Sequence, residues 1–153
     1  MKQALIILAG SFILYSCTGS DASSAAKPEP TEDERTQMMN AASDPANFTT
    51  IQWLDSTHQD LGKVQEGGVV EVSWRLKNSG NKPLIITNVN PGCGCTVAEK
   101  PEEPIAPGGE SVIKAKFDSK GQAEGMQRKE VYVKANTGND MHRLSFAVVV
   151  QKK

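Results

Sequence analysis

From Phe48 onward the chain alternates apolar and polar residues in short runs, which are separated by clusters of glycine, proline and asparagine. In the clearest run every second residue from Val70 to Leu76 is apolar, and the residues between them are polar. Successive side chains of a strand point to opposite faces of a sheet, so this period of two is typical of a half-buried strand. We therefore predict a strand here, with Trp74 in the core.

Six further segments have similar patterns, at 48–54, 84–89, 96–98, 113–117, 130–135 and 144–150. The second of them follows the turn cluster at 78–82, and we expect it to pair with the strand before that turn. About seven strands with turns roughly every ten residues predict an all-β fold, a single antiparallel immunoglobulin-like β-sandwich over residues 48–153. A small closed barrel is the alternative. Because no helical periodicity follows Phe48, βαβ architectures and their nucleotide sites are excluded.

The N-terminal residues have a different pattern. After Lys2, an apolar stretch is shorter than the roughly 20 residues that a membrane-spanning helix needs. It ends in Leu14-Tyr15-Ser16-Cys17, which looks like a bacterial lipobox. We therefore predict a lipoprotein signal peptide at 1–16 and lipidation of Cys17. A diacylglyceryl group and an N-linked acyl chain together give stable anchoring.

The alternative is an ordinary cysteine behind a secretory leader, left free or paired with Cys93 or Cys95. Thr18 and Gly19 do not resemble an inner-membrane retention signal. The expected location is therefore the outer membrane of an exported, lipid-anchored protein.

Residues 17–47 are rich in serine, alanine, proline and acidic side chains and hold few large apolar ones. Such a segment buries too little apolar surface to fold alone, so we predict a lipidated N-terminus and a flexible tether. Within it, Thr31 and Glu34 have the spacing of a capping box, which predicts a short helix at 32–42.

Net charge narrows the class of partner. The 153 residues carry a formal net charge of −1. Nucleic-acid binding depends on neutralising phosphates with a basic surface, so no nucleic-acid partner is expected.

Cys93 and Cys95 lie in the one segment with candidate chemistry, Pro91 to Thr96. Three interpretations stay open: a short, easily reduced disulfide, a soft-metal site, or two chemically silent residues at the start of a strand. The candidates to complete a metal site are His58, His142, Met126 and Met141, but they form no tight cluster in the sequence.

Motifs of the common enzyme classes are absent from the sequence, so we expect no catalytic site, no cofactor and no enzymatic activity. A carbohydrate-binding module is a weaker alternative. It depends on Trp53 being exposed, since Trp74 is predicted to be buried.

Five segments occur in an order typical of one family. They are DLGKVQEG (60–67), KNSGNKPLII (77–86), PGCGCT (91–96), PIAPG (104–108) and KEVYVKAN (129–136). Through them nearly all of the chain after Phe48 resembles the bacterial domain-of-unknown-function family 1573. Leu61 stands where members usually have phenylalanine, an exchange between core-type residues.

The resemblance implies a Hydin-like immunoglobulin-type fold in a secreted or lipid-anchored protein, of a kind common in Bacteroidetes. It implies no active site. We therefore expect a domain that binds another envelope protein or supports the envelope, with Asn90, Pro91, Gly92 and Thr96 as the candidate binding loop. The loops at 88–92 and 98–107 are the wider candidate surface. The rival is a periplasmic thiol redox or metal-handling protein that uses Cys93 and Cys95.

Overall fold

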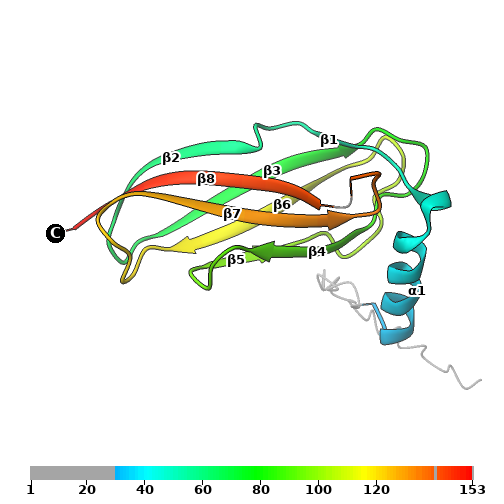
Figure 1. Cartoon of the computed structure of the whole chain (residues 1–153), viewed down its shortest axis with the longest axis horizontal. Coiled ribbons are helices and arrows are strands. Elements are labelled where there is room, and N and C mark those ends of the chain that lie inside the picture. Colours follow the sequence, from blue (N-terminus) through cyan, green and yellow to red (C-terminus); the bar gives the residue numbers. More distant parts are fainter. Residues whose placement is uncertain (1–29, 140, 153) are drawn as a thin grey trace, which may run out of the picture.

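A computed structural model describes residues 30–139 and 141–152 of the chain. The predicted signal peptide and Cys17 lie outside the described residues. Two four-stranded sheets pack face to face (Figure 1). The first has the order β1-β3-β6-β5 and the second β2-β8-β7-β4. The predicted immunoglobulin-like β-sandwich is confirmed. Its strands are β1 (Ile51–Trp53), β2 (His58–Gln65), β3 (Val69–Asn78), β4 (Ile86–Pro91), β5 (Thr96–Glu99), β6 (Glu110–Asp118), β7 (Gly125–Ala135) and β8 (Met141–Gln151).

The core lies between the sheets, as the alternation in the sequence predicts. Strands β3 and β6 run antiparallel with Trp74 opposite Ile113, and both side chains are fully buried. Phe146 of β8 lies against Trp74 and Phe117, with ring centroids 6.4 and 5.9 Å apart. Two inner faces that interdigitate in this way remove their apolar side chains from water, which is the main source of stability of a sandwich.

The prediction of seven strands missed β2. Its apolar positions, Leu61 and Val64, are an odd number of residues apart, so the strand lacks a period of two. The structure explains this, because the pairing with β8 shifts register between Asp60 and Lys63. Gly62 lies in that shift with φ +71°. β2 also pairs with β8 in parallel, which a search for hairpins does not find.

The prediction that the strand at 84–89 pairs with the strand before it is wrong. β4 pairs with β7 of the second sheet, whereas β3 pairs with β1 and β6. The connection after Asn78 therefore crosses from one sheet to the other. Leu84 within it forms an isolated bridge with Ile105.

Buried Asn78 fixes this crossing from inside the domain. Its Nδ2 donates to the carbonyl oxygens of Lys82 (2.7 Å) and Ile105 (2.8 Å). Its Oδ1 accepts from the hydroxyl of Thr49 (2.9 Å) and the backbone N–H of Gly80 (3.1 Å). A buried amide with every partner satisfied holds a loop of irregular backbone in one conformation.

Asn136, which follows β7, has an equivalent role at the start of β4. Its Oδ1 accepts from the N–H of Ile85 (2.7 Å). Its Nδ2 donates to the carbonyl oxygens of Pro83 (2.9 Å) and Asn47 (2.7 Å). The side chain is 1% exposed. One residue thus ties β4, and the segment that enters the sandwich, to the end of β7.

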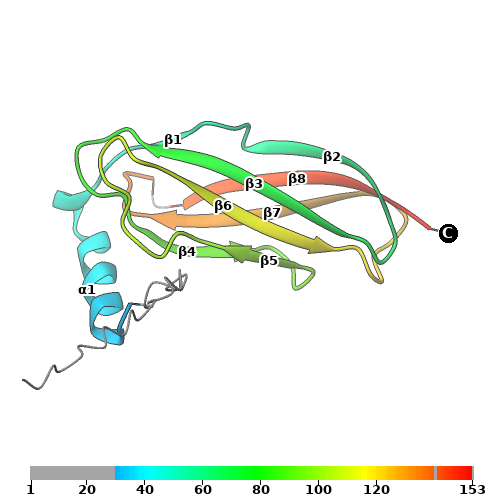
Figure 2. The same cartoon turned by 180° about the vertical axis from the view of Figure 1, so that it is seen from behind.

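The helix predicted from the capping box is confirmed as α1 (Glu32–Ser43), and the short helix η1 (Pro45–Asn47) follows it. The Glu34 carboxylate accepts from the backbone N–H of Thr31 at 2.7 Å, which lowers the pKa of Glu34. Among the described residues, no helix has the length and apolar character needed to cross a membrane. Both helices fall within 17–47, so the structure gives the second half of that segment a defined conformation. Figures 1 and 2 show α1 beside the end of the sandwich that lies away from the C-terminus.

Candidate functional site

The candidate site lies along one long side of the sandwich, where β4 and β5 are the edge strands of the two sheets (Figures 1 and 2). A groove runs between them, which we call the β4–β5 groove. It is lined by Asn88, Val89, Ala98, Glu99, Lys100 and Glu102. The two segments predicted as contact surface, 88–92 and 98–107, thus supply its opposite walls.

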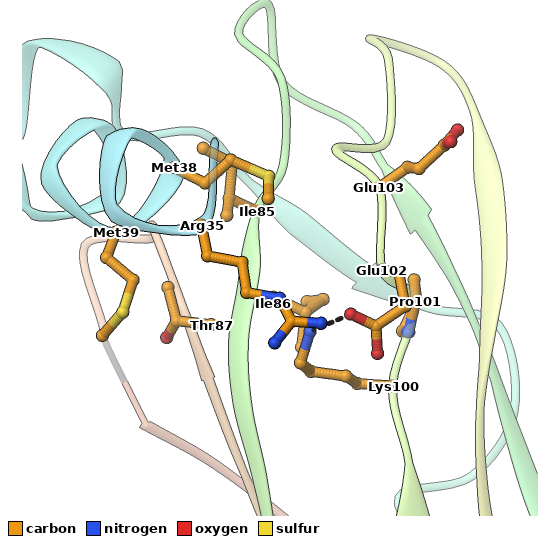
Figure 3. A pocket seen from close by; sticks show the side chains of 10 residues that line it. All are labelled: Arg35, Met38, Met39, Ile85, Ile86, Thr87, Lys100, Pro101, Glu102 and Glu103. Atoms are coloured by element: carbon orange, nitrogen blue, oxygen red, sulfur yellow. Dashed lines mark hydrogen bonds and ion pairs between the residues drawn. The ribbon is translucent and has the colours of Figure 1, made fainter. Parts of the chain in front are cut away.

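A second hollow continues the groove toward α1, and the two share Lys100 and Glu102. Figure 3 shows Met38 and Met39 projecting from the helix over this hollow, opposite the loop that follows β5. Ile86, at the start of β4, lies on its floor. The helix residues were not predicted to take part, because α1 buries only Ala42 and has no continuous apolar face that would predict docking.

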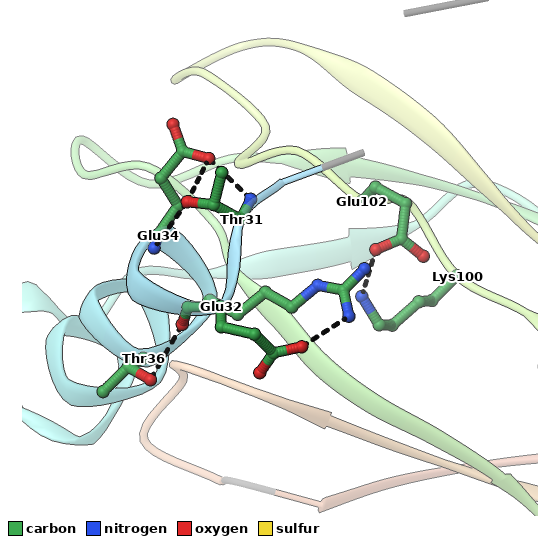
Figure 4. A network of polar contacts seen from close by, with 7 residues as sticks. Thr31, Glu32, Glu34, Thr36, Lys100 and Glu102 are labelled. Carbon is green, nitrogen blue, oxygen red and sulfur yellow. Dashed lines mark hydrogen bonds and ion pairs between the residues drawn. The ribbon is translucent and has the colours of Figure 1, made fainter. Parts of the chain in front are cut away.

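Charged side chains line the opening of this hollow. Lys100 Nζ lies 3.0 Å from Glu102 Oε2, and Arg35 Nη1 lies 3.5 Å from Glu32 Oε1 (Figure 4). Arg35 reaches from the helix toward Glu102 (Figure 3). These groups are exposed to solvent, so the pairs contribute little to stability. They place positive and negative charge side by side at one end of an otherwise partly apolar groove.

Cys93 and Cys95 form a disulfide in the loop from β4 to β5, with a Cα–Cα distance of 5.3 Å. This loop is the point at which the chain passes from the second sheet to the first. The bridge encloses only Gly94, and closing so short a loop stabilises a fold by between roughly 1 and 2 kcal/mol in the chain-entropy model. The bridge is therefore a weak clamp.

Thr96 is 3% exposed and lies directly under the bridge. Its Oγ1 is 3.5 Å from Cys93 Sγ and 3.9 Å from Cys95 Sγ. Cys95 packs against the core, and its carbonyl oxygen accepts from the N–H of Asp118 on β6 at 3.0 Å. Thr96 therefore offers no surface to a partner, and its hydroxyl is directed at sulfur.

The other residues of the predicted binding loop are accessible, but Asn90 and Pro91 belong to the end of strand β4 and not to a loop. Asn90 and Gly92 are exposed and Pro91 is half-buried. The N–H of Gly92 donates to the carbonyl oxygen of Glu130 at 2.8 Å, which holds the start of the loop against β7. Beside it, the Tyr132 hydroxyl donates to the Glu130 carboxylate, and this hydrogen bond raises the pKa of Tyr132.

The structure does not bring the predicted metal candidates to the cysteines. His58 Nδ1 lies 3.0 Å from the hydroxyl of Ser145, and His142 Nε2 lies 2.8 Å from that of Thr137. Met126 is the second residue of β7 and Met141 the first of β8, and both are exposed. Within 30–139 and 141–152, no three histidine, cysteine, aspartate or glutamate side chains are grouped as metal ligands.

Trp53, the candidate for stacking on a sugar, is only half-buried and packs against the core. Its ring lies edge-on to His142, with centroids 6.1 Å apart. Its face is thus not an open platform, and the structure lends no support to a carbohydrate-binding module.

Comparison with known families gives one match. The model described as "Protein of unknown function (DUF1573)" matches residues 51–150. No curated protein matches the chain.

Solved structures share the architecture. A protein of unknown function from Porphyromonas gingivalis W83 aligns with a TM-score of 0.60 and 18% identity, over 69% of this chain and 49% of that one. This chain therefore spans about half the length of that protein. The ASH/PapD-like domain 7 of human CEP192 gives a TM-score of 0.49 at 11% identity, over 88% of this chain and 99% of that one. The periplasmic chaperone SfaE gives 0.47 at 16% identity, over 67% and 58%. At such identities the likeness concerns the fold alone.

Proposed function

This chain belongs to the DUF1573 family, whose function is unknown, and from that premise we propose that it is a lipid-anchored cell-envelope protein with a protein-binding sandwich. The partner is another envelope protein, and an extended segment of it binds along the β4–β5 groove. The activity is binding and not catalysis. The single observation that carries the proposal is that two edge strands lie next to each other with a groove between them.

Each wall of the groove has backbone available for pairing. Among the strands that the structure describes, β4 pairs only with β7 and β5 only with β6, so one edge of each strand has none of these strands beside it. Such an edge is a template for an added strand, and recognition by strand addition uses main-chain hydrogen bonds for affinity and side-chain contacts for specificity. The groove therefore suits a partner in extended conformation better than a helix or a compact small molecule.

The side chains define the chemistry of that partner. Val97 on β5 precedes groove-lining Ala98 and is itself outside the lining; it is 65% exposed, a large apolar surface beside the groove on an edge strand. Val89 and Ala98 are half-buried in the groove walls, and Lys100 and Glu102 lie where the groove meets the hollow under α1. An extended segment with apolar side chains at alternate positions, and a charged residue near one end, complements this arrangement.

Photo-crosslinking in cells tests this proposal. A photoreactive amino acid replaces Val97 in one strain and Val69 in a second. Val69 is a matched control, since it is 61% exposed on β3, away from the groove. We expect a discrete crosslinked protein from position 97 and none from 69. The crosslinked residues should lie in a segment that is extended in the partner. Equal adducts from both positions, or none from either, would refute binding in the groove.

Lipid anchoring is tested separately with Cys17→Ser. The proposal rests on the lipobox-like run that ends at Cys17. The unsubstituted chain is expected to incorporate a labelled fatty acid and to sediment with outer membranes. The variant is expected to do neither. A variant that still takes up the label would place the anchor elsewhere, and the crosslinking result would stand unaffected.

A further inference from the structure

The Cys93–Cys95 bridge is poorly suited to the usual role of a disulfide. A structural bridge stabilises by restricting the unfolded chain, and its effect grows with the length of the loop that it closes. This bridge closes a loop that contains Gly94 alone. The two sheets meet across a continuous apolar core that does not require it. The bridge therefore adds little to stability, and the reactivity of its two sulfurs is the better indication of its role.

The two sulfurs differ in their surroundings. Cys95 is also half-buried, but it packs against the core next to buried Thr96. Cys93 is half-buried, follows exposed Gly92 and precedes exposed Gly94, neither of which carries a side chain that would cover it. An ideal Cβ built on Gly94 meets nothing within 4 Å, so the space around the turn is open. An incoming thiol thus reaches Cys93 more easily than Cys95.

The Thr96 hydroxyl lies where a thiolate would need a donor. It is 3.5 Å from Cys93 Sγ and 3.9 Å from Cys95 Sγ, so it lies within reach of either sulfur when the bridge opens. A disulfide sulfur is a weak acceptor, whereas a thiolate is a strong one. A buried hydroxyl beside a bridge therefore gains most when the bridge opens, because it can donate to the sulfur that leaves with the charge.

We propose that Cys93 and Cys95 form a thiol–disulfide exchange site for a dithiol of a partner protein. A thiolate of the partner attacks Cys93 Sγ, a mixed disulfide forms, and the Cys93–Cys95 bond breaks. Its electron pair leaves on Cys95 Sγ, and the Thr96 hydroxyl, which is 3.9 Å from this sulfur in the bridged state, turns from Cys93 to donate to it. The second thiolate of the partner then attacks the partner's own sulfur in the mixed disulfide and releases Cys93.

The balance of this sequence is a two-electron transfer. The partner dithiol loses two electrons and becomes a disulfide, and the Cys93–Cys95 bridge gains them and becomes two thiols, each with a proton from a partner thiol or from water. A disulfide of a second partner re-oxidises the pair by the same steps in reverse. The site does not depend on the β4–β5 groove being a binding site, although the bridge stands in the loop that joins its two strands.

The first test incubates the full folded chain with excess reduced glutathione in the absence of denaturant. Free thiols are then alkylated, and only the peptide that contains residues 93–95 is quantified, so that Cys17 does not contribute. We expect reduction of the bridge while near-ultraviolet circular dichroism shows the sandwich to be intact. A bridge that is reduced only after denaturant unfolds the domain is structural, and that outcome would overturn the proposal.

Substitutions test the roles of the two sulfurs and of the hydroxyl. In Cys95→Ser the remaining Cys93 should react with oxidised glutathione at least about tenfold faster than the remaining Cys95 of Cys93→Ser, since thiol access controls such rates. Starting from the reduced pair, Thr96→Val should slow re-oxidation by oxidised glutathione about tenfold, the size expected for one hydrogen bond to a charged sulfur.

Thr96→Ser retains the hydroxyl and is the matched control, expected to react within about twofold of the unsubstituted chain. The pKa of the Cys95 thiol, followed by alkylation rate against pH in Cys93→Ser, should rise in Thr96→Val and not in Thr96→Ser. Equal rates and equal pKa values in all three chains would remove Thr96 from the mechanism, and equal reactivity of the two cysteines would remove the assigned order of attack.

Discussion

The two long sides of the sandwich are built from edge strands in the same way, yet one is closed and the other is open. On the β1–β2 side, Gln59 Nε2 donates to the carbonyl oxygen of Ser73 at 2.7 Å and so links β2 of one sheet to β3 of the other. On the β4–β5 side, a groove separates the strands, and the Cys93–Cys95 bridge lies within the loop that joins them. Figures 1 and 2 both show the β1–β2 side along the top of the sandwich and the β4–β5 side along the bottom.

The closed side also carries features that discourage pairing with another chain. β1 has only three residues, and β2 is interrupted by a register shift beside Gly62. Short strands, irregular register and charged side chains such as Lys63 are common protections of a sheet edge. On the open side, Val97 is exposed on β5. On this side too β5 has only four residues, and the pairing of β4 shifts register between Ile86 and Asn88. The two sides therefore differ in the groove and in exposed Val97, and not in strand length or regularity.

The largest expected effect concerns the internal support of the open side. Asn136→Ala removes the buried side chain that satisfies backbone groups of Ile85, Pro83 and Asn47, and it leaves these partly buried groups without that partner. We expect the free energy of unfolding to fall by about 3 kcal/mol, measured by urea denaturation with tryptophan fluorescence. Asn88→Ala, at an exposed position of β4, is the control and should change it by less than about 0.5 kcal/mol. Similar values for both variants would mean that the open side does not depend on Asn136.

A smaller effect is expected from opening the closed side. Gln59→Ala removes the hydrogen bond to Ser73 between the sheets. The expected loss is about 1 kcal/mol in the free energy of unfolding, together with faster hydrogen exchange of the amides of β2. Gln52→Ala, at an exposed position of β1, is the matched control. If Gln59→Ala leaves both stability and exchange unchanged, the hydrogen bond to Ser73 does not hold the two sheets together on this side. It would then no longer distinguish the β1–β2 side from the β4–β5 side.

The sequence predicted the parts of this comparison that depend on burial. Val70 to Leu76 and Leu144 to Val150 alternate regularly because one face of each strand lies in the core, and this pattern identified β3 and β8. It could not identify β2, whose pairing is parallel, distant in sequence and interrupted at Gly62. The pattern could also not identify the strand that pairs with β4. Whether β4 pairs with β3 or with β7 depends on buried side chains such as Asn78.

The candidate site was predicted unevenly for the same reason. Cys93 and Cys95 stand out in the sequence, and their spacing already allowed a disulfide among other states. The two walls of the groove were named as loops from their turn composition. The hollow beside Met38 and Met39 was not predicted, because α1 packs there through a few contacts and not through a periodic apolar face. A regular period of apolar residues indicates which side chains lie in a core, whereas a shallow surface contact produces no such period.

The smallest expected effect is a pH dependence of stability that comes from the closed side. Asp55, between β1 and β2, accepts from Arg75 Nη2 at 2.7 Å and from the Arg75 backbone N–H at 2.8 Å. These hydrogen bonds, the side-chain one first, lower the pKa of Asp55 below its ordinary value of 3.8. A carboxyl whose pKa is lower in the folded state stabilises the fold above the unfolded pKa, and this contribution is lost as the pH falls through the folded pKa.

Asp55→Asn should therefore be less stable than the unsubstituted chain at neutral pH, and the difference should shrink below about pH 4. Glu124→Gln is the control, because it removes an exposed carboxyl in the loop between β6 and β7. The difference in stability between this variant and the unsubstituted chain should not change with pH. Urea denaturation across this pH range measures both. Curves for Asp55→Asn that run parallel to those of the unsubstituted chain at every pH would show that the Asp55–Arg75 contact does not help to fasten the closed side.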